Sequence, residues 1–484
     1  MKTTNRLQRQ RILPAGSGSG RATPKIDPLL VLAGLMVAMV AAGFAFLPVR
    51  EAAAYGAGIT YSGKAACNDC HSGFHRGGVA RCDGCHTMHN SKGNAKMTYN
   101  QGGSIGDGLP HLLLAADTSS TCLYCHANNS TSREDYSDIF VSNPATPVGP
   151  QALTPGGNFG WLKKSYTWTG GTSPGQSHGH NIVAQDFGFA ADSRTTQSPG
   201  GDYATGKLSC ISCHDPHGRY RRLTGGSEVN DGPHIKSSGS KGEMPMGGLA
   251  VGSYRLLAGV NYQTSSAPEH AFANRSPVAV IPSYGWIDDG DFGYTPSVNR
   301  SEAETDTRVA YGQGMSEWCA NCHGGFHGDG NGSGEMSRHP AGQAGRLGAA
   351  IAANYNAYLK TGNMSGSSTT AYSSLTPFEE GHADYAALSN SATNSLAGPD
   401  ASANVSCLSC HRAHASGWDS MGRWNFNAIF LTVAGEWPGS DGGVDPEHHQ
   451  GRTKAETRLS YYDRPPTKFA TWQRSLCNKC HAKD

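Results

Sequence analysis

The sequence predicts a loop-rich fold with short helices and little regular secondary structure, whose core consists of cofactors bound covalently to the chain. Three observations lead to this expectation. Every one of the 14 cysteines belongs to a Cys-x-x-Cys-His string, and seven such strings are present. Charged residues make up only 16% of the chain, against roughly 25% in a typical globular protein. Glycine accounts for 64 of the 484 residues, so turns are frequent and long amphipathic stripes are few.

Each Cys-x-x-Cys-His string is an attachment site for c-type haem. The two thiols add across the vinyl groups of the haem, and the histidine that follows becomes the first axial ligand of the iron. We therefore expect a multihaem cytochrome c fold with seven haem c groups. The attachment cysteines are Cys67, Cys70, Cys82, Cys85, Cys122, Cys125, Cys210, Cys213, Cys319, Cys322, Cys407, Cys410, Cys477 and Cys480. The first axial ligands are His71, His86, His126, His214, His323, His411 and His481.

A paired cysteine can also form a zinc site, a disulfide or a redox-active dithiol. None of these requires a histidine directly after the second cysteine. Only 21 of the 484 residues are histidine, so chance does not place one after all seven pairs. The pattern therefore favours haem attachment over the alternatives.

The first 54 residues have the pattern of an export signal. A basic region is followed by an apolar stretch from Leu29 to Leu47, and residues 52–54 are three alanines that suit cleavage before Tyr55. An uncleaved membrane anchor is the alternative, because the apolar stretch is long. Export agrees with haem attachment, which takes place outside the cytoplasmic membrane.

Residues 55–484 are expected to form one seven-haem domain, since no linker or change in composition divides them. This part of the chain carries 32 lysines and arginines against 36 aspartates and glutamates, a net charge of −4. A mildly acidic chain without a basic cluster argues against nucleic acid as a partner.

Regular structure is expected at only a few places. Residues 342–360 are the best candidate for a helix, with Leu347, Ile351, Tyr355 and Tyr358 near one face. The haem strings themselves should form short helical turns. The remainder consists mainly of turn-rich tracts joined by short apolar pieces.

Three other patterns are more simply interpreted as surface features. The glycine-rich GDGNGSG has no preceding strand and no following Lys-Ser or Lys-Thr, so we expect a turn rather than a phosphate-binding loop. The cluster Asp288, Asp289 and Asp291 could hold calcium, but a solvated turn is the simpler interpretation. The neighbouring His448 and His449 are expected to be exposed.

Fourteen histidines lie outside the haem strings, enough to give every iron a second imidazole. An iron with two protein ligands transfers electrons but has no open position for a substrate. Five of these histidines follow a string histidine by three or four residues: His75, His89, His217, His327 and His414. On a helical turn this spacing places both rings on the same side, so the second ring cannot close the opposite face of its own iron. We expect each of these histidines to serve a neighbouring haem.

Long strings of this chain resemble those of one known family. They include FHRGGVARCDGCHTMHNS from Phe74, TPGGNFGWLKKSYTW from Thr154, TRVAYGQGMSEWCANCH from Thr307 and CLSCHRAHASGWDSMGR from Cys407. GHNIVA, CHDPHGRYRRL and the terminal CNKCHAKD also match. On these strings the chain resembles the outer-membrane cytochrome S-like family of six-haem cytochromes, which polymerise into extracellular conducting filaments in metal-reducing bacteria.

The resemblance implies that all irons have two histidine ligands and that the haems are stacked in a continuous chain. It adds His180 and His339 as the two missing second ligands. It also implies that one subunit lends a histidine to a haem of the next, and the matching residue here is His89. The string at Cys67 is absent from the six-haem pattern, so it either lengthens the haem chain or caps one end of it. No family position matches His111, His178, His234, His270, His382, His448 or His449, which we rank low as ligands.

These observations lead to an exported electron-transfer protein, extracellular or on the outer surface, that forms a head-to-tail homopolymer. Its electron donors would be periplasmic and outer-membrane cytochromes, and its acceptors extracellular metal oxides or electrodes. A monomeric electron shuttle with the same ligated haems is the first alternative. A multihaem reductase of nitrite or a sulfur oxyanion is the second, but such an enzyme needs an iron with an open position.

Overall fold

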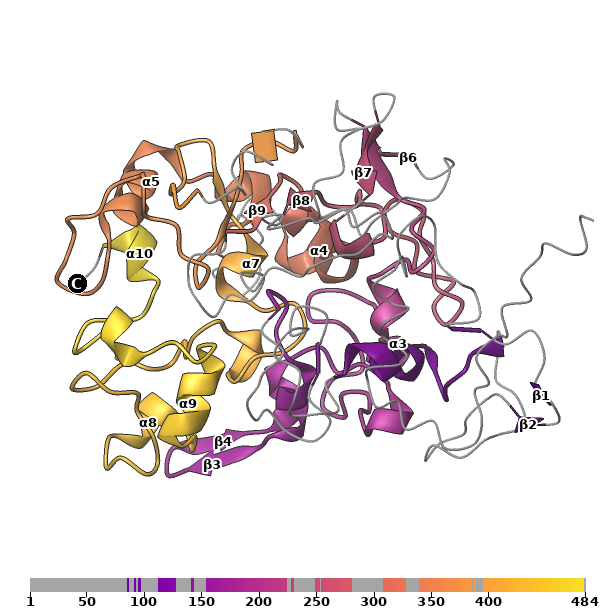
Figure 1. The fold of residues 1–484 in the computed structure, drawn as a ribbon, viewed down its shortest axis with the longest axis horizontal. Coiled ribbons are helices and arrows are strands. Elements are labelled where there is room, and N and C mark those ends of the chain that lie inside the picture. The colour runs from indigo at the N-terminus through magenta and orange to yellow at the C-terminus, as the bar shows by residue number, and fades with distance from the viewer. Residues whose placement is uncertain are drawn as a thin grey trace, which may run out of the picture. The chain divides into compact units, whose positions relative to one another are not determined.

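The computed structural model describes residues 85–86, 91–92, 95–96, 112–127, 141–142, 154–223, 228–229, 249–252, 254–280, 308–327, 339–384, 387–388 and 395–482 (Figure 1). The export signal, the string at Cys67, the glycine-rich turn and the Asp288 cluster lie outside these residues, as do Cys82, His75, His89, His111 and His234. The predictions on them stay predictions, and so does the single domain over residues 55–484.

The described chain is rich in loops, and its longest helix has ten residues. The helices are α3 (Thr118–His126), α4 (Met315–His323), α5 (Gly348–Ala357), α7 (Cys407–Cys410), α8 (Pro446–His449), α9 (Lys454–Ser460) and α10 (Asn478–His481). Short 3-10 turns such as Phe159–Lys163, Cys210–Ser212 and Gly342–Gly345 connect them. The prediction of a loop-rich fold with short helices is confirmed.

Strands are two to four residues long. β8 (Ala279–Val280), β9 (Ala310–Tyr311), β10 (Phe378–Glu379) and β11 (Asn404–Val405) form a sheet in the order β11-β10-β9-β8. In this sheet β10 lies parallel to β9, and the other two pairs are antiparallel. The smaller sheets contain β1 (Ser91–Lys92) with β2 (Ala95–Lys96), β3 (Tyr166–Trp168) with β4 (Gly171–Ser173), and β5 (Arg221–Leu223) between β6 (Glu228–Val229) and β7 (Leu249–Gly252).

Serine residues start two of the turns that carry cysteines. In SCISCH, Ser209 and Ser212 form a reciprocal capping box around the turn that begins at Cys210. In SCLSCH, Ser406 and Ser409 form the same box around α7. A capping box satisfies backbone donors at a helix start, which explains how turns of three or four residues persist without a long helix behind them.

The predicted helix over 342–360 is present but shorter. Gly348 has a φ of +65°, so the residues before it cannot continue the helix and form a separate 3-10 turn. The helix ends where the N–H of Tyr358 bonds to the carbonyl of Asn354. Of the predicted stripe, Tyr355 is buried within the helix and Ile351 is partly buried, while Leu347 and Tyr358 are buried just before its start and just after its end.

Two helices were not expected. The α9 helix begins at a capping box of Thr453 and Glu456, a signal that is legible in the string TKAE. The α8 helix buries His449, which is 5% exposed, so the expectation of exposure was wrong for this residue. The neighbouring His448 is half-buried against the ring of Phe430, and the two ring centres lie 5.9 Å apart.

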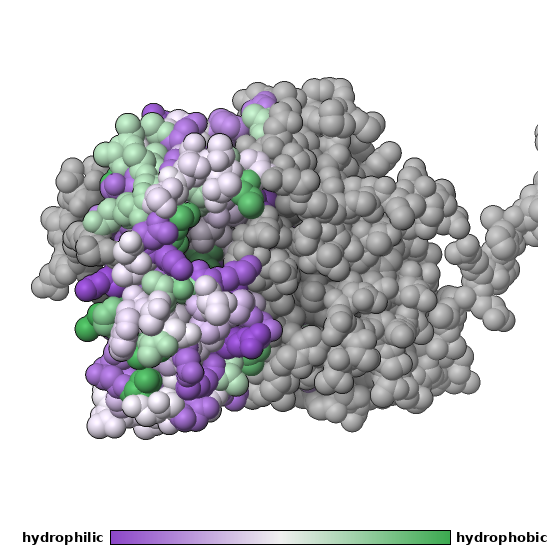
Figure 2. Space-filling view, turned by 60° about the vertical axis from the view of Figure 1, so that its left-hand side comes forward, coloured by the Kyte–Doolittle hydropathy of each residue, from purple (hydrophilic) through white to green (hydrophobic). Residues whose placement is uncertain are grey.

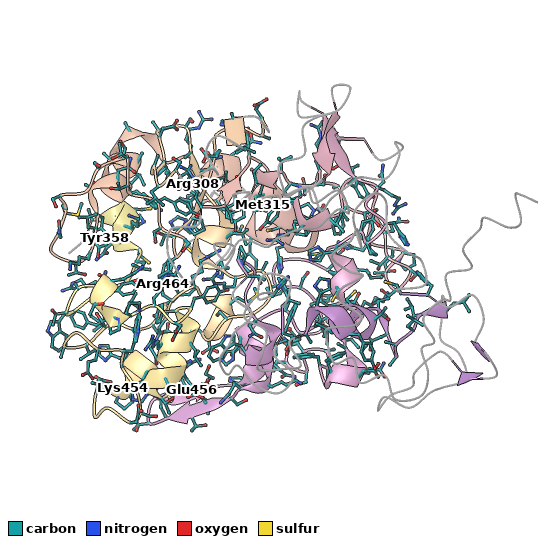
Figure 3. The ribbon with its side chains drawn as sticks, in the orientation of Figure 1. Arg308, Met315, Tyr358, Lys454, Glu456 and Arg464 are labelled. Carbon is teal, nitrogen blue, oxygen red and sulfur yellow. The ribbon has the colours of Figure 1, made fainter. Side chains whose placement is uncertain are left out.

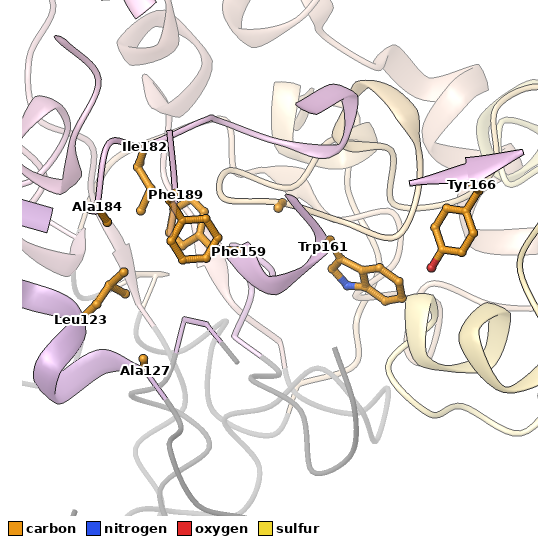
Figure 4. Close-up of a cluster of buried hydrophobic side chains, with 9 residues drawn as sticks. Leu123, Ala127, Phe159, Trp161, Tyr166, Ile182, Ala184 and Phe189 are labelled. Atoms are coloured by element: carbon orange, nitrogen blue, oxygen red, sulfur yellow. The ribbon is translucent and has the colours of Figure 1, made fainter. Parts of the chain in front are cut away.

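Buried hydrophobic residues in the described part of the chain form several separate clusters. One cluster gathers Leu123, Phe159, Trp161, Ile182 and Phe189 (Figure 4). A second is mainly aromatic and contains Trp418, Trp424, Trp437 and Tyr461, with the last two rings stacked 4.4 Å apart. Small clusters of this kind agree with a core that depends on groups other than aliphatic side chains.

Among the described residues, several arginines are almost completely buried, and the four with the lowest exposure are Arg412, Arg423, Arg452 and Arg464, the last labelled in Figure 3. Arg452 lies 4.2 Å from the ring centre of Tyr166 and 4.4 Å from that of Trp418. Its guanidinium donates to the carbonyls of Gly417 and Gln450 and to the hydroxyl of Ser173. Arg452 thus ties the β3–β4 hairpin to the C-terminal helices.

The surface carries isolated apolar side chains. On the face shown in Figure 2, hydrophobic residues are scattered among hydrophilic ones. The exposed large hydrophobic residues include Leu359, Met364, Ile429 and Trp472. In the described segments, no helix has the length and apolar character needed to cross a membrane.

Replacing Arg452 with methionine should lower the free energy of unfolding by about 2–4 kcal/mol, because several buried acceptors lose their donor. Arg458→Met is the matched control, since this side chain is 48% exposed and pairs with Asp463 on the surface. The control should change stability by no more than about 0.5 kcal/mol. Chemical denaturation followed by circular dichroism measures both, and equal effects would contradict the assigned role of Arg452.

Candidate haem sites

The structure places five of the seven strings in helical turns. CLYCH ends α3, CISCH begins with the capped turn Cys210–Ser212, CANCH ends α4, CLSCH contains α7 and CNKCH contains α10. Of the string at Cys82, Cys85 and His86 are described, and His86 makes an isolated antiparallel bridge with Leu113. The expected helical turns are therefore present at five strings.

Cysteines of the strings lie at the edges of the hydrophobic clusters. Cys210, Cys213, Cys322, Cys410 and Cys480 each pack against a different cluster. A planar apolar group bound through these sulfurs would touch the clusters beside it. This placement fits haem, which needs an apolar surrounding and a covalent attachment point at its edge.

Cysteines of successive strings lie close together. The thiols of Cys210 and Cys122 are hydrogen-bonded, which lowers the pKa of Cys210. The thiols of Cys407 and Cys319 are hydrogen-bonded as well, which lowers the pKa of Cys407. Electrostatic contact also joins Cys213 with Cys322, and Cys410 with Cys477. The strings from Cys122 to Cys477 are therefore neighbours in chain order.

Several of these cysteines have raised pKa values, unlike the cysteines of a reactive dithiol. Burial raises the pKa of Cys322 to about 12, that of Cys410 to about 12 and that of Cys480 to about 11. Redox-active and nucleophilic cysteines have lowered pKa values instead. None of the eight cysteines from Cys210 to Cys480 is in a disulfide. The described residues also contain no group of three or more side chains suited to a metal ion alone.

Three pairs of imidazole rings face one another across distant parts of the chain. The ring centres are 6.0 Å apart for His180 and His323, and 6.4 Å apart for His214 and His414. His339 and His481 form the third pair, at 6.1 Å. Metal–imidazole bonds of about 2 Å on both sides of one metal would separate two ring centres by roughly 6 Å. The spacing of each pair therefore fits one iron.

Hydrogen bonds orient several of these rings. The Nδ1 atom of His214 lies 2.8 Å from the carbonyl of Arg255, that of His323 lies 2.8 Å from Pro199, and that of His411 lies 2.7 Å from Ser420. The same atom of His180 lies 2.6 Å from the carbonyl of Ala413. A carbonyl can only accept, so Nδ1 carries the proton and Nε2 keeps its lone pair. Histidines that bind metals are held in this way.

Burial keeps these imidazoles neutral. It lowers the pKa of His180 to about 4 and that of His414 to about 3, and it lowers the pKa of His214 and His411 as well. Only a neutral imidazole offers a lone pair to a metal. These four histidines therefore have the protonation state that iron ligation requires.

Histidines outside the predicted ligand set make different contacts. Both ring nitrogens of His178 are occupied, Nε2 by the hydroxyl of Ser173 at 2.7 Å and Nδ1 by the carbonyl of Trp161 at 2.9 Å. His270 bonds through Nε2 to the carbonyl of Asn321 at 2.7 Å. These bonds engage both ring nitrogens of His178 and the Nε2 atom of His270.

One short segment, residues 413–416, connects two of the histidine pairs. Ala415 makes backbone bridges to both Gly157 and Gly179. The carbonyl of Ala413 holds the ring of His180, and the carbonyl of His414 accepts from the N–H of His180 at 2.9 Å. The ring of His414 faces His214, not the His411 of its own string. The position agrees with the argument from spacing that a follower histidine cannot close its own iron.

Two other predicted second ligands, His217 and His327, lie beside acidic side chains. The Nδ1 atom of His217 lies 3.7 Å from Oδ1 of Asp215, and the Nε2 atom of His327 lies 3.6 Å from Oε1 of Glu317. The ring contact of His411 is with the edge of Phe426 at 5.6 Å. Within the described segments, no imidazole faces His411 as His180 faces His323.

Sequence reasoning missed the groups that support the ligands. Phe159 stacks on His414 with ring centres 4.7 Å apart, and the carbonyls of Pro199, Arg255 and Ser420 each orient a string histidine. No local motif marks these residues, because tertiary packing alone brings them to the histidines.

Paired neutral imidazoles beside cysteine strings in a loop-rich fold define a c-type cytochrome that binds several haems. No family model matches the chain. It is 48% identical over 424 residues to the C-type cytochrome OmcS of Geobacter sulfurreducens, covering 85% of this chain and 94% of that protein. Solved structures of OmcS nanowires and of the outer membrane cytochrome S filament, both from that organism, each have a TM-score of 0.72. They share 46% and 47% identity, and the match covers 85% of this chain and all of theirs.

The chain belongs to the OmcS family of c-type cytochromes. The resemblance inferred from the sequence strings is therefore confirmed. The protein is an electron-transfer protein with covalently bound haem c.

Glycine at position 179 allows the 413–416 segment to approach closely. A Cβ atom there would lie 2.4 Å from the carbonyl oxygen of His414 and 2.5 Å from the Cβ of Ala415. Gly179→Ala should therefore displace His180 and His414 together and change the visible and electron paramagnetic resonance spectra. Gly206→Ala is the control, because nothing lies within 4 Å of a Cβ at that position. Spectra of the first variant that match wild type would contradict the positioning role of the segment.

Proposed function

We propose that this protein is the subunit of an extracellular filament that carries electrons through seven c-type haems, each with two histidine ligands. The observation that supports this most directly is the spacing of the three imidazole pairs, 6.0, 6.4 and 6.1 Å between ring centres. When bound, haem supplies an iron that changes its oxidation state by one electron. The residues of the chain hold that iron and close both of its axial positions.

Three ligand pairs follow from the geometry. His323 with His180, His214 with His414, and His481 with His339 would each hold one iron. In every pair one histidine belongs to a Cys-x-x-Cys-His string and the other comes from a distant segment. Ligation would therefore tie each attachment turn to another part of the fold.

The remaining string histidines are His71, His86, His126 and His411, and the remaining candidates for second ligands are His75, His89, His217 and His327. We assign His89 of a neighbouring subunit to His411, whose ring meets Phe426 and no second imidazole among the described residues. The string at Cys67 would supply the seventh haem. The attachment cysteines are the seven pairs named from the sequence.

Assembly by a lent ligand fits a filament. A head-to-tail contact that does not close on itself continues indefinitely, and each junction would be completed by one iron–histidine bond. The solved relatives are described as nanowires and as a filament. A monomeric shuttle is the alternative, since its haems would be ligated in the same way and only its assembly would differ.

Export through the periplasm would bring the chain to the outer cell surface. Periplasmic and outer-membrane cytochromes would serve as electron donors, and extracellular metal oxides or electrodes as acceptors. A reductase of nitrite or a sulfur oxyanion would need one iron with an open position, and the paired imidazoles favour closed irons.

His180→Ala should convert one iron from low-spin to high-spin and allow it to bind carbon monoxide, because its second imidazole is lost. His178→Ala is the matched control two residues away, since its ring nitrogens are engaged by Ser173 and Trp161. The control should keep every iron low-spin, although it should be less stable. Electron paramagnetic resonance counts the high-spin irons. A low-spin His180→Ala protein would refute the assignment of His180.

His89→Ala should leave haem attachment and the fold of the subunit intact but shorten or abolish the fibres, because the lent ligand is missing. Cryo-electron microscopy of secreted material checks this, with His111→Ala as a control that should form full-length fibres. Normal fibres from the His89 variant would exclude His89 as the lent ligand. Single particles alone from wild-type protein would favour the monomeric shuttle.

A further inference from the structure

Glu379 is a completely buried acid that the proposed function does not use. It lies in β10, at the centre of the four-stranded sheet between β9 and β11, and its exposed fraction is 0%. Burying a carboxylate is costly unless hydrogen bonds or a cation compensate its charge. The surroundings of Glu379 therefore determine whether it holds a proton.

Only one oxygen of Glu379 has hydrogen-bond partners. Its Oε1 atom accepts from the N–H of Ser316 at 2.7 Å and from the hydroxyl of the same serine. Its Oε2 atom is buried and has no partner in the described structure. Two bonds from one residue leave half of the carboxylate charge without compensation.

The bonded serine lies where two haem strings meet. Ser316 is in the first turn of α4, which carries Cys319. Its hydroxyl also accepts from the N–H of Cys407, the first residue of α7, at 3.1 Å. The thiols of Cys319 and Cys407 are hydrogen-bonded to one another. A single residue, Ser316, thus connects Glu379 to the proposed attachment points of two successive haems.

No cation offsets the charge of Glu379 among the described elements packed against it. The nearby charged group on α4 is Glu317, a second acid, which together with burial raises the pKa of Glu379 to about 8. The guanidinium of Arg308, just before β9, is paired with the adjacent Glu380. On β11 the neighbouring residue is the neutral Asn404, and the cysteines become uncharged thioethers once haem is attached.

We propose that Glu379 is a redox-linked proton site, which binds a proton when the haem pair held by the Cys319 and Cys407 strings gains an electron and releases it when that electron leaves. This inference rests on the proposed function. The step balances, because one electron enters the iron from the preceding donor and one proton from water converts carboxylate to carboxylic acid. The site binds only a proton.

The physical reason is the interaction of two like charges in a dry interior. An added electron makes the haem pair more negative, which disfavours a nearby carboxylate and favours its protonated form. By linkage, protonation of Glu379 makes reduction easier, so the reduction potential of this pair should fall as the pH rises around 8. The other haems should depend less on pH in this range.

Spectroelectrochemical titration of the holoprotein at several pH values tests the proposal, with Glu379→Gln as the variant. Glutamine keeps the size of the side chain and removes the proton equilibrium. The pH dependence of two haems should be lost in this variant, while Glu379→Asp should retain it. Glu380→Gln is the neighbouring control and should keep the wild-type slope.

Infrared difference spectra of the reduced and oxidised protein provide a second readout. A protonated carboxyl band should appear on reduction of wild-type protein and be absent from Glu379→Gln. An unchanged slope together with an unchanged band in this variant would overturn the proposal. Haem content and the low-spin spectrum of the same samples show separately whether ligation by two histidines holds, so failure of the proposed function would be distinguishable.

Stability supplies an independent check on the premise. The pKa of Glu379 is raised on folding from 4.5 to about 8, so its contribution to stability is complete below pH 4.5 and is lost as the pH rises through 8. Thermal unfolding of wild-type protein should therefore move to lower temperature over this range, and less so for Glu379→Gln. Identical pH profiles would show that Glu379 is not protonated in the folded protein and would overturn the proposal.

Discussion

The pairing of imidazoles across one iron is the interaction on which the proposed account depends. Residues near positions 180, 214 and 339 meet residues near 323, 414 and 481, and in each case the ring centres stand at the distance that two axial ligands require. Helices of ten residues or fewer and small separate clusters give such a chain little independent core. Metal ligation between distant segments would supply the missing long-range connections, as in other proteins whose folding is coupled to a bound metal.

Two of the imidazole pairs are also connected to one another through the backbone. Residues 413–416 contact the segments around Gly157 and Gly179, so one strand-like piece carries His414 and supports His180. A displacement of this piece would reach two neighbouring irons at once. Ser316 in α4 is shared in a similar way, because it donates to Glu379 and its hydroxyl accepts from the N–H of Cys407 in α7. The proposed haems would therefore share supporting residues, and the proton proposed for Glu379 would act on a pair rather than on one iron.

The sequence was sufficient to predict the loop-rich character and the family, because local strings and composition determine both. The sequence also predicted that His414 does not face the iron of its own string, because a spacing of three residues places both rings on the same side of a helical turn. The ligand pairs themselves could not be derived, because tertiary structure brings His180 to His323 and no local pattern encodes it. No sequence motif marks Glu379, and its burial depends on a sheet whose strands have two residues each. The α9 helix was legible in its capping box but was overlooked among turn signals.

The most direct test of the central claim is a cryo-electron microscopy map of the secreted protein at a resolution that separates imidazole rings from porphyrin. The account requires density for one haem iron between His180 and His323, one between His214 and His414, and one between His339 and His481. An iron that joins His214 to any residue other than His414, or that has an open axial position, would contradict it.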